Sequence, residues 1–166
     1  VAALAEHAAH VAHAVAVLVG HHAEEAAEVG RDHVPAPAHE PAVARVGLAA
    51  VAGRRVPHRL LAEVAGQPEA DLEQGLREAV GAGVLATDAA TGSYAFRHAL
   101  LQEAVYGDLL PGEQVRLHAA YARRLAADPG GAAAELAHHC LASHDLAGAL
   151  AASVRAAEQA TTVLAP

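Results

Sequence analysis

Several residue types are missing from this chain or are rare in it. It has no methionine and no lysine, so all 11 basic residues are arginines, and it has one cysteine, Cys140. A single cysteine excludes an internal disulfide and fits a reducing compartment. The missing methionine leads us to expect a piece of a longer protein. Arginine in place of lysine, with abundant alanine, glycine, valine and proline, indicates a GC-rich bacterial genome.

Large side chains and positive charge are also scarce. Aromatic residues make up 2% of the 166 residues, and much of the 54% hydrophobic content is alanine, which predicts a thin core and marginal stability for the isolated piece. The formal net charge of -8 argues against non-specific binding to nucleic acid or to an anionic membrane. The apolar stretch 11–20 is interrupted by His13 and is too short to span a bilayer. We therefore expect a cytoplasmic protein.

Residues 1–34 are the first predicted unit, an alanine-rich helical segment with many histidines. His7, His10 and His13 recur every three residues and drift around a helix, which favours a half-polar helix face over a metal site. His21 shares a helical face with a glutamate four residues later, but the spacing fixes no third ligand for zinc. We therefore predict no metal site here.

Residues 35–110 are the second predicted unit, which begins in a proline-rich linker (31–41). Leu72, Leu76 and Val80 are spaced four apart, as on the buried face of a helix. Three helices and a β-hairpin make a winged helix. The helices are expected over Pro41–Ala52, from Pro57 to a stop at Gly66, and from Pro68 to Gly81, and the strands over Val84–Asp88 and Ser93–Arg97.

The third helix of a winged helix commonly enters the major groove of DNA. Here that helix carries four acidic residues and a single cation, Arg77. Such a surface repels phosphate, and three arginines before it (54, 55 and 59) are more often solvated or paired with acidic neighbours. We expect no direct contact of this segment with nucleic acid.

The run Tyr94–Leu110 changes period in its middle. In its first residues, side chains alternate between two faces as in a strand. Its later leucines and valine repeat every four residues as in a helix. His98 falls at the change, next to Arg97. Unpaired N–H groups and the positive end of the helix dipole attract anions at such a point, so His98 and Arg97 can contact a phosphate. The alternative is that His98 only caps or packs between strand and helix.

Residues 111–166 are the third predicted unit, an all-helical one. One helix is expected over Pro111–Asp128, with His118 or Ala119 on its apolar stripe, and a helix pair over Ala132–Ser143 and Leu146–Ala160. Stacked helix pairs of this kind are typical of tetratricopeptide-like arrays. The pair also contains the residue types of a zinc site, namely His138, His139, Cys140 and His144. The turn expected at 143–145 separates Cys140 from His144 and favours packing residues instead.

Three of these segments resemble one family, the signal-transducing ATPases with numerous domains, in particular the large LuxR-type (MalT-like) transcriptional regulators. The resemblance rests on Gly20, Glu24 and Glu25 at the end of the ATPase lid, on VAGRRVPHRLLAEVAG (51–66), and on the Tyr94–Leu110 run. It implies that 1–34 is the end of the lid, 35–110 the winged helix and 111–166 the start of a helical repeat array.

The resemblance also implies a role for His98. In related apoptosis and plant-resistance ATPases, a Met-His-Asp triplet at this junction carries a histidine that contacts the β-phosphate of ADP. The triplet here is Arg97, His98 and Ala99. We therefore expect ATP or ADP as cofactor of the parent protein, with none bound by this piece alone.

The sequence contains no phosphate loop and no nucleophile–base arrangement, so we expect no enzymatic activity from this piece by itself. The resemblance implies a switch segment that couples the nucleotide state of an upstream ATPase domain to downstream helical and DNA-binding domains of the same chain. Two alternatives remain open. The piece is a helical scaffold for protein partners, or the same ATPase module is attached to a cyclase or kinase output.

Overall fold

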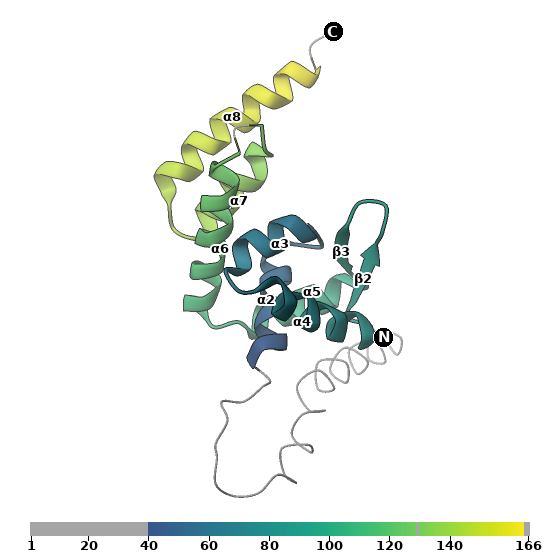
Figure 1. The fold of residues 1–166 in the computed structure, drawn as a ribbon. Coiled ribbons are helices and arrows are strands. Elements are labelled where there is room, and N and C mark those ends of the chain that lie inside the picture. Colours follow the sequence, from purple (N-terminus) through teal and green to yellow (C-terminus); the bar gives the residue numbers. More distant parts are fainter. Residues whose placement is uncertain (1–39, 129, 165–166) are drawn as a thin grey trace, which may run out of the picture. The chain divides into compact units, whose positions relative to one another are not determined.

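The computed structural model describes residues 40–128 and 130–164. Within them the chain is mainly helical with one small antiparallel sheet, which confirms the predicted mainly α class (Figure 1). The chain divides between Asp108 and Leu109 into two units, which are described separately. The predicted unit 1–34, with its histidines and its glutamate pair, lies outside the described residues. No helix among the described residues is long and apolar enough to cross a lipid bilayer.

The first unit combines four described helices with three strands. The predicted helices and the hairpin are present, with ends shifted by one or two residues. In chain order the elements are α2 (Glu40–Ala52), β1 (Arg55–Pro57), α3 (His58–Ala65), α4 (Glu69–Gly81), β2 (Leu85–Asp88), β3 (Ser93–Phe96) and α5 (Ala99–Asp108).

Proline and glycine set the limits of the short helices. Pro57 and Pro68 stand directly before α3 and α4 as their N-caps. The first N–H groups of a helix have no partner within the helix, so a proline at its start costs no helical hydrogen bond. Gly66 ends α3 in the left-handed conformation, with φ 61°, as a helix stop requires. The prediction that Pro57 is the first helical residue is wrong, because Pro57 is also the last residue of strand β1.

The sheet has the strand order β1-β3-β2, and both pairings are antiparallel. Val56 pairs with Tyr94, and Leu85 pairs with Phe96. Strand β1 was not predicted, because three residues that end in proline are too few to show a period. Its presence turns the predicted hairpin into a three-stranded sheet.

Leucines from several elements fill the core of the first unit. Leu61, Leu72, Leu76, Leu85 and Leu101 are each 1% exposed or less. Leu72 and Leu76 are two of the three residues predicted from their spacing of four, and the third, Val80, is half-buried. Burying one leucine contributes roughly 1.5–3 kcal/mol relative to leaving it exposed.

The second unit contains α6 (Pro111–Ala126), α7 (Ala133–Ala142) and α8 (Leu146–Leu164). Helix α7 packs against both α6 and α8. Their shared apolar core is small, because most of its members have short side chains, as the composition predicts. They are Ala122, Leu136, Cys140, Ala149 and Ala152.

Candidate functional site

Strand β3 and helix α5 are separated by two residues, which are the predicted phosphate-contacting pair. β3 ends at Phe96 and α5 begins at Ala99, so the predicted change from strand to helix is confirmed. Arg97 and His98 form the bend between them, and both are exposed. Both predicted site residues therefore lie at the surface, at the start of a helix.

Hydrogen bonds and burial fix this junction to the rest of the first unit. The Leu101 N–H donates to the His98 carbonyl at 3.0 Å, and the Leu101 side chain is 1% exposed. One residue later, the Gln102 side-chain amide donates to the Ala50 carbonyl of α2 at 2.8 Å. A buried leucine and a hydrogen bond to α2 thus anchor the first turn of α5 in the first unit.

The electrostatics of the junction suit an anion. The first turn of α5 contains no acidic residue that would offset the positive end of its dipole. Arg97 adds a permanent positive charge, and His98 adds an imidazole, a ring that is able to donate a hydrogen bond. A phosphate placed there would meet backbone N–H groups and two side-chain donors.

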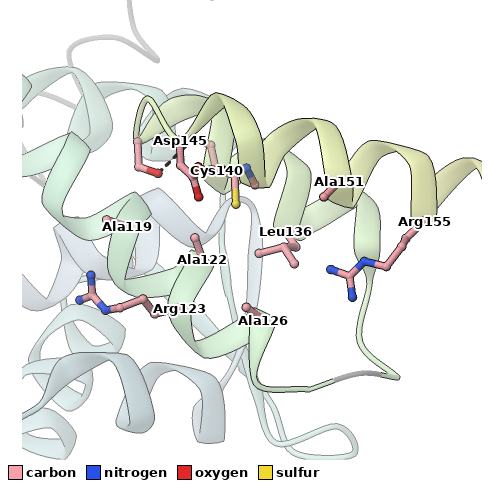
Figure 2. Close-up of a pocket in the computed structure, with 11 residues that line it drawn as sticks. Ala119, Ala122, Arg123, Ala126, Leu136, Cys140, Asp145, Ala151 and Arg155 are labelled. Carbon is pink, nitrogen blue, oxygen red and sulfur yellow. Dashed lines mark hydrogen bonds between the residues drawn. The ribbon is translucent and has the colours of Figure 1, made fainter.

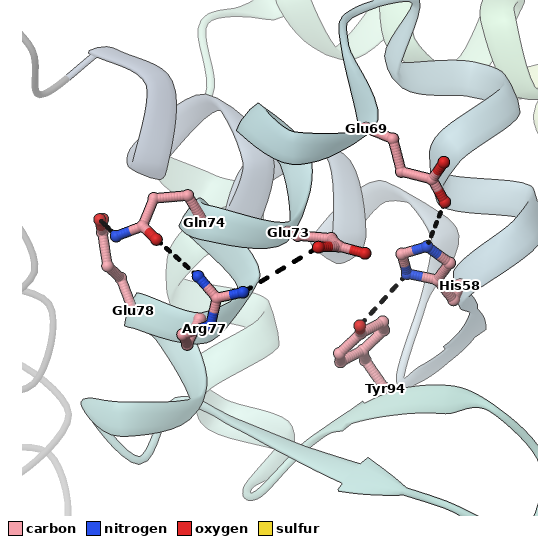
Figure 3. Close-up of polar contacts among 7 residues, drawn as sticks. All are labelled: His58, Glu69, Glu73, Gln74, Arg77, Glu78 and Tyr94. Atoms are coloured by element: carbon pink, nitrogen blue, oxygen red, sulfur yellow. Dashed lines mark hydrogen bonds and ion pairs between the residues drawn. The ribbon is translucent and has the colours of Figure 1, made fainter.

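The exposed surface of α4 has a different character (Figure 3). Its one cation, Arg77, donates to the Gln74 side-chain oxygen at 2.6 Å and lies 4.0 Å from a carboxylate oxygen of Glu73. The Gln74 amide in turn donates to Glu78 at 2.8 Å. The side chains of the same helix therefore already engage the positive charge of α4.

A second polar cluster joins α3, α4 and the sheet (Figure 3). The His58 ring contacts the Tyr94 hydroxyl at 3.2 Å and a carboxylate oxygen of Glu69 at 3.4 Å. The pKa of Tyr94 is raised, first by burial and then by the negative charge of Glu73. The sequence analysis missed this cluster, because 36 residues separate His58 from Tyr94 and no local period connects them.

In the second unit, α6, α7 and α8 line a groove of about 430 Å³ (Figure 2). Four alanines and Leu136 line it, and Cys140 points into it. Two arginines, Arg123 and Arg155, also line it. Asp145, in the turn before α8, also lines it, so the groove is largely apolar and carries charges of both signs.

The structure separates the histidine and cysteine group that the sequence placed together. Cys140 lies on the groove, and His144 lies in the turn after α7 with φ 65°. His139 points instead toward α6, where its Nδ1 lies 2.8 Å from the Nδ1 of His118. The predicted separation of Cys140 and His144 by a turn is confirmed.

His118 and His139 are both 1% exposed, and their surroundings make them poor bases. Burial lowers the pKa of His118 to about 4, and burial together with the two neighbouring histidines lowers that of His139 to about 3. The Tyr121 ring stacks on His139 with centroids 4.9 Å apart. The only sequence signal for His118 was its place beside Ala119 on the apolar stripe of α6.

Comparisons of the chain with protein-family models, with curated proteins and with solved structures found no match.

Proposed function

We propose that the chain is a non-catalytic switch segment of an ATP-dependent, LuxR-type transcriptional regulator. In this proposal residues 35–110 are a winged helix and 111–166 begin a tetratricopeptide-like array. The observation that carries the proposal is the β3–α5 junction, where Arg97 and His98 are exposed beside a helix start without acidic residues.

The topology of the first unit supports a winged helix. The order α2, β1, α3, α4, β2, β3 gives three helices, a short strand after the first of them, and a terminal hairpin. The antiparallel sheet places β3 between β1 and β2, so the chain leaves the middle of the sheet directly into α5. In the second unit, α7 and α8 form one helix hairpin, which is the building unit of a helical array.

The charges on α4 support a role without DNA contact. This helix carries acidic residues in its first turn, and its cation is engaged by Gln74 and Glu73. DNA binding needs cations that are free to neutralise phosphate, and Arg77 would first have to leave its partners on the same helix. In the proposal, a separate domain of the parent protein binds DNA.

The proposed mechanism is a shift between two states. ADP held by the upstream ATPase domain contacts His98 and Arg97 and so keeps the winged helix against that domain. ATP or effector binding favours the released state, which passes the signal to the helical array. The differential contact is the phosphate at the junction, because only one of the two states makes it.

The test uses the full-length parent protein. Since a hydrogen bond to a charged group contributes about 1.5–3 kcal/mol, His98→Ala should weaken ADP binding roughly tenfold or more and raise basal output. His144→Asn, a change of another exposed histidine, should leave ADP affinity as it is. Unchanged ADP affinity in His98→Ala would refute the role of the junction.

A helical interaction scaffold is the second candidate, and one feature of α8 favours it. Leu146, Leu150 and Val154 are spaced four apart and are 52–69% exposed, so they form an apolar stripe open to a partner. The parent reading frame separates the candidates. A phosphate loop upstream and a basic helix-turn-helix downstream would support the regulator, a cyclase or kinase domain would change only its output, and the absence of a phosphate loop would leave the scaffold.

A further inference from the structure

Three imidazole rings from two helices meet in the second unit. His118 of α6 and the adjacent His138 and His139 of α7 lie with ring centroids 5.0 to 5.4 Å apart in all three pairs. One ligand nitrogen from each ring lies within 4.8 Å of the other two. Nothing in the chemistry of the proposed switch uses this cluster.

The rings of His118 and His139 face each other through their Nδ1 atoms, which lie 2.8 Å apart. Nδ1 is therefore the nitrogen that each of these two rings offers to a shared ion. A small turn of the rings toward a shared ion would replace the 2.8 Å contact with metal–nitrogen bonds.

We propose that His118, His138 and His139 bind one zinc ion and so fasten α6 to α7. Zinc binds imidazole nitrogen at about 2.0–2.1 Å, which sets neighbouring ligands of a tetrahedral site roughly 3.3 Å apart. The distances between the ring nitrogens bracket that value. The Nδ1 atoms of His118 and His139 are 2.8 Å apart, and the ligand nitrogens of all three rings lie within 4.8 Å of one another. In the proposal, rotation of the side chains brings the three nitrogens onto one ion.

The setting of the cluster meets two further needs of a zinc site. His138 is exposed, so an ion can enter from solvent although the other two rings are buried. Glu135 lies one turn before His138 on α7, so its negatively charged carboxylate shares a helix face with His138. That charge offsets part of the charge of the ion, and water completes the fourth position.

The experiment follows individual histidines, because the chain has 13 of them and several can bind zinc weakly. The whole chain, labelled with ¹⁵N, is titrated with Zn²⁺ up to one equivalent, and long-range ¹H–¹⁵N spectra report each ring nitrogen. We expect the ring nitrogens of His118, His138 and His139 to shift together. If these rings keep their shifts at one equivalent, the proposal is overturned.

Variants of exposed residues test the same site without disturbing the core. His138→Ala removes one ligand and should weaken zinc binding at least tenfold and abolish the zinc-induced rise in thermal midpoint. His144→Asn, a change of a nearby exposed histidine outside the cluster, should behave as the wild type. Equal zinc affinity of His138→Ala and the wild type would overturn the assignment.

Discussion

The Nδ1 atoms of His118 and His139 lie 2.8 Å apart, and both imidazoles are almost fully removed from solvent. At this distance one ring donates a proton and the other accepts it, so at most one Nδ1 is protonated in the hydrogen bond. A second proton would place cations side by side in an apolar setting. The pair thus couples the packing of α6 and α7 to pH.

The metal-free protein should lose stability in acid for this reason. Both histidines have pKa values near 6.5 when unfolded, against about 4 for His118 and about 3 for His139 in the folded chain. The unfolded state therefore binds more protons below pH 6.5. The stabilisation is complete above pH 6.5 and is lost as pH falls toward 4 and then 3.

Urea unfolding in the presence of a chelator, followed by NMR signals of α7, measures this effect. Between pH 7 and pH 5 we expect a loss of about 2 kcal/mol for each histidine. The double variant His118→Gln/His139→Gln lacks the titrating rings and should show a flatter dependence. An equal slope in the double variant and the wild type would contradict the assignment to this pair.

The second prediction concerns Arg45 of α2 and Gly75 of α4, which lie in close contact. Arg45 is 7% exposed, and its side chain fills the space where a Cβ on Gly75 would stand. Gly75→Ala forces the buried Arg45 side chain to move, which should lower the free energy of unfolding by about 1–3 kcal/mol. The gain in helix propensity, roughly 1 kcal/mol, offsets part of that loss.

Gly107→Ala is the matched change. Gly107 lies in α5, and a Cβ there would meet nothing within 4 Å, so this variant should gain up to about 1 kcal/mol from helix propensity. Thermal unfolding of the two variants measures the difference. If Gly75→Ala stabilises the chain as much as Gly107→Ala does, the side chain of Arg45 does not require that space.

Local patterns in the sequence predicted the helices and the hairpin. They did not predict structure that depends on contacts between residues far apart in the chain. The spacing of Leu72 and Leu76 identified the buried face of α4, because residues four apart in sequence lie on the same face of a helix. Strand β1 was missed because it is defined by its pairing with β3. The pairing of His118 with His139 was missed because it depends on the register between two helices, 21 residues apart in the chain.

The candidate sites divide in the same way. The position of His98 between strand and helix follows from a change of period, and the structure has that change at the predicted place. Whether a ring points outward or inward depends on the neighbouring helix. His138 and His139 are adjacent in sequence and both rings lie near His118 of α6, yet His138 is exposed and His139 is 1% exposed.

Asp145 has two roles, and two substitutions separate them. Its side chain accepts the Gly148 N–H at 2.9 Å and so caps the start of α8. Its negative charge also holds the pKa of the Cys140 thiol above its ordinary value, as a second cause after burial. Asp145→Ala removes both the cap and the charge, whereas Asp145→Asn keeps a capping oxygen.

We expect Asp145→Ala to cost about 1 kcal/mol in the free energy of unfolding, within a usual range of roughly 0.5–2 kcal/mol, and Asp145→Asn to cost little. Both variants should lower the pKa of Cys140, because both remove the charge. Urea unfolding measures the first effect, and the pH dependence of thiolate absorbance measures the second. If the thiol pKa stays unchanged in Asp145→Asn, burial alone accounts for its shift, and Asp145 acts only as a helix cap.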